Sequence, residues 1–179
     1  PTIAEELLAA NPQLLITDVG STKAELLHEL AAPAAAGRFI GAHPMCGSHL
    51  QGDEHADPTL YQDALCVLTP DPAAPADTVA KVQGFWQAVG CRTCLMDASA
   101  HDQAVARVSH LPHVLAAACM RAADHAQLPL AASGFRDTTR VAAGGTELWR
   151  DILLSNRAAV GEGIDAVIAD LHALRAHLH

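Results

Sequence analysis

The sequence predicts an α/β fold followed by an all-α part. Two observations carry this prediction. Apolar runs of strand length alternate with helix-like patterns as far as residue 96, which indicates a parallel sheet with crossover helices. Beyond Asp97 only helical periodicity is readable. We therefore expect two domains, at residues 1–96 and 97–179.

The elements of the first domain follow from local patterns. Strands are expected where continuous apolar runs end at turn residues, and helices where apolar residues recur at helical spacing. Asp77 is positioned to cap one of these helices and Gly90 to end it. In order, we expect helix 2–10, strand 14–18, helix 22–30, strand 39–42, strand 64–69, helix 77–89 and strand 93–96.

The second domain is expected to hold only helices. One long helix should run over residues 99–127, and Pro112 inside it should bend it. A helix capped by Thr146 and a last helix from about residue 160 follow. Because these helices expose much apolar surface, we expect a homodimer through this domain.

Composition excludes several classes of protein. The net charge of −9 leaves no basic patch for a nucleic-acid ligand. No apolar run approaches the ~20 residues of a membrane span. The five cysteines are odd in number and irregularly spaced, which suits reduced thiols in the cytoplasm. Cys91 and Cys94 form a C-x-x-C pair, for which a metal or redox role is the minor alternative.

His43 is the leading candidate for a catalytic group. The run 39–42 reads as a buried strand, and Pro44 ends it while holding His43 extended. A histidine at the carboxyl end of a strand is well placed to accept a proton from a ligand. An ordinary strand-end histidine is the equal alternative.

Other polar residues sit at element ends or at the expected helix bend. If they converge with His43, the site has imidazole bases, hydroxyl donors and one guanidinium that suits a carboxylate. A metal site at the two bend histidines is weak because it lacks a third ligand, and His113 is alternatively a buried histidine bonded to Ser109. Asp18 reads as a loop cap, and Ser21 lacks a nucleophile elbow. The candidates are Ser21, Ser48, Ser109, His110, His113 and Arg140.

Five blocks of this sequence, in order and in register, resemble the prephenate dehydrogenases of tyrosine biosynthesis. The blocks span residues 14 to 156 and together are highly specific. They are LITDVGSTK at 15–23, FIGAHPMCG at 39–47, SHLPH at 109–113, GFRDTTR at 134–140 and LWRDI at 148–152.

The resemblance implies a partial Rossmann-type domain followed by a helical substrate-binding and dimerisation domain. It implies oxidative decarboxylation of prephenate or arogenate, with NAD or NADP accepting the hydride. His43 would accept the hydroxyl proton, and Ser21 would contact His43, the hydroxyl and the nicotinamide. Arg140 would bind a carboxylate, while His110 and His113 line the substrate pocket. Ser48 and Ser109 would add polar contacts.

One family feature is missing from these 179 residues. No G-x-G-x-x-G turn is present to bind a pyrophosphate. We expect a fragment of a longer enzyme, inactive by itself and a poor binder of NAD. The alternative is a non-catalytic dimeric paralogue that binds an aromatic-pathway carboxylate without NAD.

Overall fold

A computed structural model describes residues 2–47 and 55–178 of the chain. The chain divides into two compact units, residues 1–102 and 103–179. Each is described by itself below. The division falls six residues after the expected end of the first domain and lies inside a helix.

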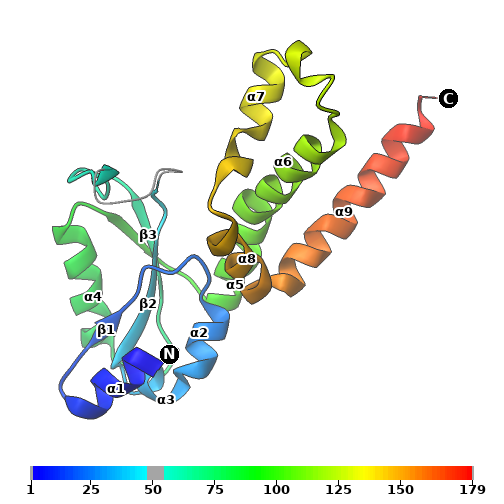
Figure 1. Cartoon of the computed structure of the whole chain (residues 1–179). Coiled ribbons are helices and arrows are strands. Elements are labelled where there is room, and N and C mark those ends of the chain that lie inside the picture. The colour runs from blue at the N-terminus through cyan, green and yellow to red at the C-terminus, as the bar shows by residue number, and fades with distance from the viewer. Residues whose placement is uncertain (1, 48–54, 179) are drawn as a thin grey trace. The chain divides into compact units, whose positions relative to one another are not determined.

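A four-stranded sheet forms the centre of the first unit, in the order β1-β2-β3-β4 (Figure 1). The strands are β1 (Ile16–Thr17), β2 (Phe39–Pro44), β3 (Leu65–Thr69) and β4 (Arg92–Leu95). All four expected strands are therefore confirmed, although β1 is shorter than its apolar run.

The parallel sheet expected from the sequence needs one correction. β1 and β2 are parallel, as are β3 and β4, but β2 runs antiparallel to β3. The connection between β2 and β3 contains no α-helix in its described residues, 45–47 and 55–64. Parallel neighbours are usually joined through a crossover helix, whereas antiparallel neighbours can be joined by a loop, which fits the antiparallel pairing of these two strands. The sheet is mixed.

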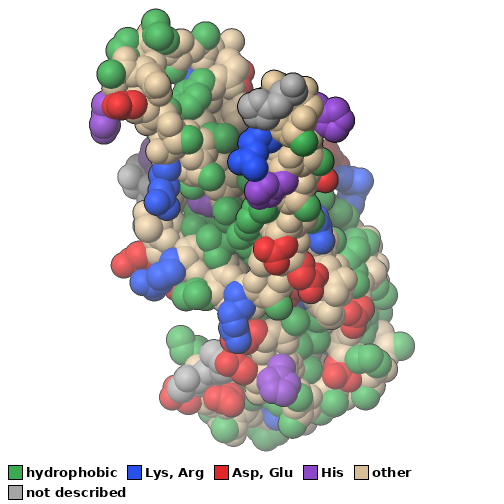
Figure 2. Space-filling view, turned by 90° about the vertical axis from the view of Figure 1, so that its right-hand side faces the viewer, with side chains coloured by type: hydrophobic (Ala, Val, Ile, Leu, Met, Phe, Trp, Pro, Cys, Tyr) green, Lys and Arg blue, Asp and Glu red, His purple; other side chains and the backbone are tan. Residues whose placement is uncertain are grey.

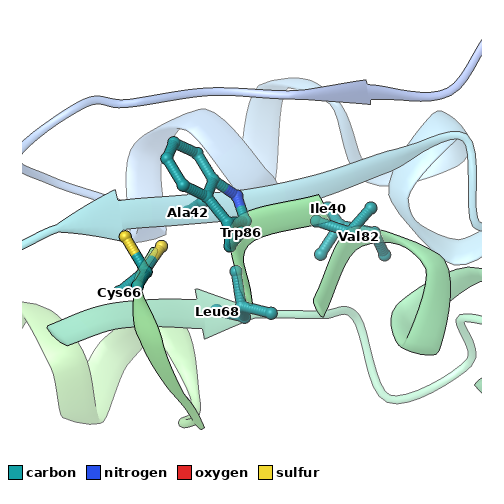
Figure 3. Close-up of a cluster of buried hydrophobic side chains, with 7 residues drawn as sticks. Ile40, Ala42, Cys66, Leu68, Val82 and Trp86 are labelled. Atoms are coloured by element: carbon teal, nitrogen blue, oxygen red, sulfur yellow. The ribbon is translucent and has the colours of Figure 1, made fainter. Parts of the chain in front are cut away.

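Helices cover both faces of this sheet. On one face, α4 inserts Val82 and Trp86 against Ile40, Ala42 and Leu68 (Figure 3). On the other face, Leu30 and Ala34 pack on Phe39. Side chains of β2 thus alternate between two cores, which explains its uninterrupted apolar run. The helices of this unit are α1 (Thr2–Ala10), α2 (Ala24–Glu29), α3 (Ala31–Ala35) and α4 (Ala76–Ala88).

The described residues of the second unit are helical throughout, as expected. α5 (Ala98–Val105) leads through a π-helical segment (Ala106–His110) into α6 (Leu111–Ala122). The expected helix 99–127 therefore ends five residues early and changes its winding instead of only bending. Pro112 has no N–H to donate, and the wider π turn directly precedes it.

Short helices complete the second unit. Residues 131–145 contain α7 (Ser133–Thr139) and a 3-10 turn (Arg140–Ala143). α8 (Thr146–Ser155) and α9 (Arg157–Ala176) confirm the last two expected helices, with Gly145 rather than Thr146 in the cap position of α8. A further 3-10 turn covers Leu128–Leu130.

α9 carries an open apolar stripe. Its first half is covered within the unit, with Val160 and Gly163 buried. Its second half exposes Ile168, Leu171 and Leu174 by 47, 56 and 64%. Among the described residues, no helix has the length and apolar character that a membrane crossing requires.

Candidate active site

His43 occupies the end of β2, where the sequence placed it. It is half-buried, lies opposite Val67 of β3, and is followed by the buried Pro44. Its side chain projects to the same face of the sheet as Phe39, the face covered by α2 and α3. The strand and the proline together fix the backbone from which this imidazole projects.

Two residues that sequence reasoning missed hold the imidazole of His43. Its Nδ1 lies 2.9 Å from Nε2 of His101, and the two rings meet edge to face at 76°. His101 is 1% exposed, and its Nδ1 lies 2.8 Å from Oδ1 of Asp102. A chain of hydrogen bonds thus runs from a strand end to a buried carboxylate in the middle of α5.

Asp102 is anchored by backbone as well as by His101. Its carboxylate oxygens accept the N–H of Lys23 at 2.9 Å and that of Ala24 at 2.8 Å. These donors begin α2, so Asp102 caps a helix 78 residues earlier in the chain. Burial raises the pKa of Asp102, but the hydrogen bonds from His101, Ala24 and Lys23 outweigh it and leave the pKa below its usual value. The carboxylate is therefore ionised near neutral pH.

An ionised Asp102 decides which nitrogens carry protons. A carboxylate can only accept, so Nδ1 of His101 is its donor. In the neutral ring Nε2 of His101 is then an acceptor, and Nδ1 of His43 donates to it. In this tautomer the ring lone pair of His43 resides on Nε2, so that nitrogen is the one with the chemistry to accept a proton.

A second buried pair lies beside this chain. Lys23, with no exposed surface, forms an ion pair with Asp18 and donates to the carbonyl of Ala42 at 2.8 Å. Burial lowers the pKa of Lys23, while the negative charges of Asp18 and Asp102 act in the opposite direction. Asp18, expected to be only a loop cap, does accept the Gly20 N–H at 2.9 Å, yet it also pairs with Lys23.

Of the other candidates in the first unit, one can be placed. Ser21 is half-buried in the turn between β1 and α2, two residues before Lys23. Ser48 lies outside the described residues.

In the second unit, His110 at the end of the π-helical segment and His113 in α6 both contact the ring of Trp149. His110 is 1% exposed, and its Nδ1 lies 3.2 Å from Nδ2 of Asn156. His113 stacks on Trp149 with 3.5 Å between ring centroids and 9° between planes. This stacking, rather than a bond to Ser109, fixes the ring of His113; burial lowers its pKa, and the backbone of Val141 acts in the opposite direction.

His113 and Trp149 line a cavity of about 450 Å³ in the second unit. Most of the lining is apolar, with the guanidinium-bearing residues Arg121 and Arg150 at its border. Arg140 is exposed on its 3-10 turn and is not part of this lining, and Ser109 is half-buried. The lining residues are His113, Val114, Ala117, Ala118, Arg121, Ala142, Gly144, Thr146, Trp149, Arg150 and Leu153.

Within the described parts of the chain, no cluster of three or more histidine, cysteine or acidic residues is arranged to hold a metal ion. On the face in Figure 2, lysine and arginine side chains are interspersed with acidic ones. The first unit offers a pair of hydrogen-bonded imidazoles backed by a carboxylate, and the second a cavity lined by His113 and Trp149.

Comparison with known proteins places both units. The model of the prephenate dehydrogenase nucleotide-binding domain matches residues 1–95, and that of the prephenate dehydrogenase dimerization domain matches residues 97–179. The chain is 35% identical over 174 residues to a cyclohexadienyl dehydrogenase of Zymomonas mobilis, covering 93% of this chain and 59% of the relative. It is 34% identical over 174 residues to the prephenate dehydrogenase of Bacillus subtilis, covering 93% and 47%.

Solved structures agree. A prephenate dehydrogenase from A. aeolicus, in complex with hydroxyphenyl propionate and NAD+, superposes with a TM-score of 0.89 at 30% identity, over 99% of this chain and 64% of that one. A Synechocystis arogenate dehydrogenase gives 0.85 at 30%, over 99% and 66%. The chain spans about half the length of the curated relatives it matches.

Proposed function

Because this chain belongs to the prephenate dehydrogenase family, we propose that it supplies the proton-accepting site and the helical domain of a dehydrogenase that oxidatively decarboxylates prephenate or arogenate. The observation that carries the proposal is the hydrogen-bonded chain from His43 through His101 to Asp102. An imidazole held in one tautomer by a buried carboxylate is the arrangement that a general base needs.

His43 takes the proton of the substrate hydroxyl on Nε2. The positive charge that then develops on the His43 ring is stabilised by the negative charge of Asp102, through the hydrogen bonds that His101 makes to both residues. Departure of that proton strengthens electron donation from oxygen to the ring carbon that is oxidised. Loss of carbon dioxide follows because it makes the ring aromatic.

NAD+ or NADP+, when bound, supplies the hydride acceptor. The described residues do not fit the pyrophosphate of such a dinucleotide. The N–H groups of Lys23 and Ala24 that begin α2 already bind Asp102, and the 179 residues contain no G-x-G-x-x-G turn. The proposal therefore assigns only Ser21 to the nicotinamide side, and it expects weak NAD binding by this chain alone.

The substrate's carboxylates and ring are assigned to the remaining candidates. Arg140 is proposed to bind a carboxylate, and its exposed position leaves the guanidinium accessible. His113, His110 and Ser109 are proposed to line the substrate pocket, supported by the aromatic cavity beside His113. Ser48 is proposed as a further polar contact.

We further propose a homodimer in the cytoplasm. The matched dimerization domain and the open apolar stripe of α9 support the dimer. The cysteines, none of which forms a disulfide, fit a reducing compartment.

The test is His43→Ala in the complete gene product, assayed with prephenate, arogenate and both dinucleotides. Removing a general base should lower kcat by about 10²- to 10⁴-fold while KM changes little. His28→Ala, on the exposed side of α2, is the matched control and should keep full turnover. Retention of more than a tenth of the turnover by His43→Ala would contradict the mechanism.

The poor fit of the described residues to a dinucleotide pyrophosphate also favours a second candidate function. This is a non-catalytic paralogue that binds an aromatic-pathway carboxylate without NAD. Calorimetry with prephenate separates the two: binding by the complete gene product without any turnover supports the paralogue. Normal turnover by the 179-residue chain alone would contradict the expected dependence on further sequence.

A further inference from the structure

The backbone of Ala42, the residue before His43, is held by two side chains. Its N–H donates to Oδ1 of Asp18 at 2.8 Å, and its carbonyl accepts from Nζ of Lys23 at 2.8 Å. β1 ends at Thr17, which pairs with Ile40, so no β1 residue continues the ladder as far as Ala42. The two side chains replace the strand ladder at this point, because buried backbone groups need partners.

The pair is enclosed by its surroundings. Lys23 has no exposed side-chain surface, and that of Asp18 is 19% exposed. The stem of Lys23 passes over Gly41, where an added Cβ would lie 3.4 Å from its Cδ. The Gly20 N–H donates a hydrogen bond of 2.9 Å to Oδ2 of Asp18, the oxygen that does not bind Ala42. Both members are therefore set in one geometry by their neighbours.

Lys23 also reaches His43 by a second route. Its backbone N–H donates to Asp102, which binds His101, which in turn binds the ring of His43. One residue thus holds the peptide preceding His43 and the carboxylate at the far end of its imidazole chain. A shift of Lys23 would move both together.

We propose that the Asp18–Lys23 pair positions His43, holding its imidazole in one orientation and one tautomer. Both residues act through Ala42 and Asp102 and do not touch substrate. The proposal rests on the proposed function only for its effect on turnover, since the effect on the ring of His43 is measurable without catalysis.

The experiment uses the 179-residue chain with ¹⁵N-labelled histidine, and nitrogen shifts report the protonated ring atom of His43. The double variant Asp18→Asn/Lys23→Met removes the donor to Ala42 without leaving an unpaired buried charge. Its His43 should change from one tautomer, protonated on Nδ1, to a mixture of two. Lys81→Met, which breaks the exposed ion pair with Asp77 on α4, should leave His43 unchanged.

The single variant Asp18→Asn breaks the ion pair from its other member. The amide keeps one oxygen for the Ala42 N–H, but its NH₂ group faces the Gly20 N–H and Nζ of Lys23, which are both donors, so His43 should again show a mixture of tautomers. A folded double variant with unchanged His43 signals would overturn the proposal. If the double variant does not fold, an unchanged tautomer in Asp18→Asn overturns the proposal and a changed one supports it.

Kinetics of the complete gene product give a separate readout. A misplaced base should cost the double variant about 100-fold in kcat with KM nearly unchanged. If His43→Ala proves fully active, the proposed function fails, yet the tautomer result still decides whether the pair positions His43. If the tautomer changes and turnover does not, the positioning role for catalysis is refuted.

Discussion

Replacing Asp102 by Asn should destabilise the first unit substantially, although the two side chains have the same shape. The carboxylate accepts at least three donors: the Lys23 N–H and His101 Nδ1 on one oxygen, and the Ala24 N–H on the other. An amide has one accepting oxygen. At least one buried N–H must therefore face the new NH₂ group, which is itself a donor.

The magnitude follows from these contacts. A buried donor left without a partner costs about 1–3 kcal/mol, and the remaining bonds lose the strength of a charged acceptor, about 1 kcal/mol more. We expect the free energy of unfolding to fall by about 2–4 kcal/mol. Asp97→Asn is the matched control, because exposed Asp97 accepts only the Ala100 N–H at the start of α5. Its cost should stay below about 0.5 kcal/mol, since Asn caps a helix as well as Asp does.

Urea unfolding followed by tryptophan fluorescence measures both variants. Each unit holds one tryptophan, Trp86 in the first and Trp149 in the second. In a Trp149→Phe background, the fluorescence reports the first unit alone. If Asp102→Asn costs no more than Asp97→Asn, the carboxylate does not hold the three donors as described.

Two pH effects follow from the same structure. The pKa of Asp102 is lowered in the folded state. Its contribution to stability is therefore present above the unfolded pKa of about 3.9 and is lost as pH falls through the folded pKa. Between pH 6 and 3, the urea midpoint of the wild type should fall more steeply than that of Asp102→Asn. The pKa of His113 is also lowered, so its contribution is present above about 6.5 and is lost as pH falls through the lower folded value. In a Trp86→Phe background, emission of Trp149 should change with that protonation, and a flat profile between pH 7 and 4 would contradict the observed stacking.

The sequence predicted the part of the site that depends on local structure. An uninterrupted apolar run followed by His-Pro places His43 at a strand end, because proline and burial act within a few residues. The same holds for β3, α4 and α9, whose patterns are long or sharply bounded. The antiparallel pairing of β2 and β3 was missed, since it depends on the path of the connection between them.

His101 and Asp102, which support the imidazole of His43, could not be predicted from local sequence patterns. His101 and Asp102 meet β2 and α2 across 58 and 79 residues, and helical periodicity does not say which distant group a buried polar side chain meets. The sequence offered one signal, an adjacent His-Asp pair within the first five residues of the helix that follows the last strand; the structure shows both side chains buried. Lys23 gave no signal, because a lysine at a helix start usually points to water.

The lack of a side chain at Gly41 restricts which residues its neighbours can be replaced by. A methyl group there would collide with Thr69 Oγ1 and come within 2.9 Å of Leu27, besides approaching the stem of Lys23. An alanine at 41 therefore needs a smaller residue at 69 and a displaced or smaller side chain at 27, whereas the approach to Lys23 is close to ordinary contact. Among homologues, positions 27, 41 and 69 should covary.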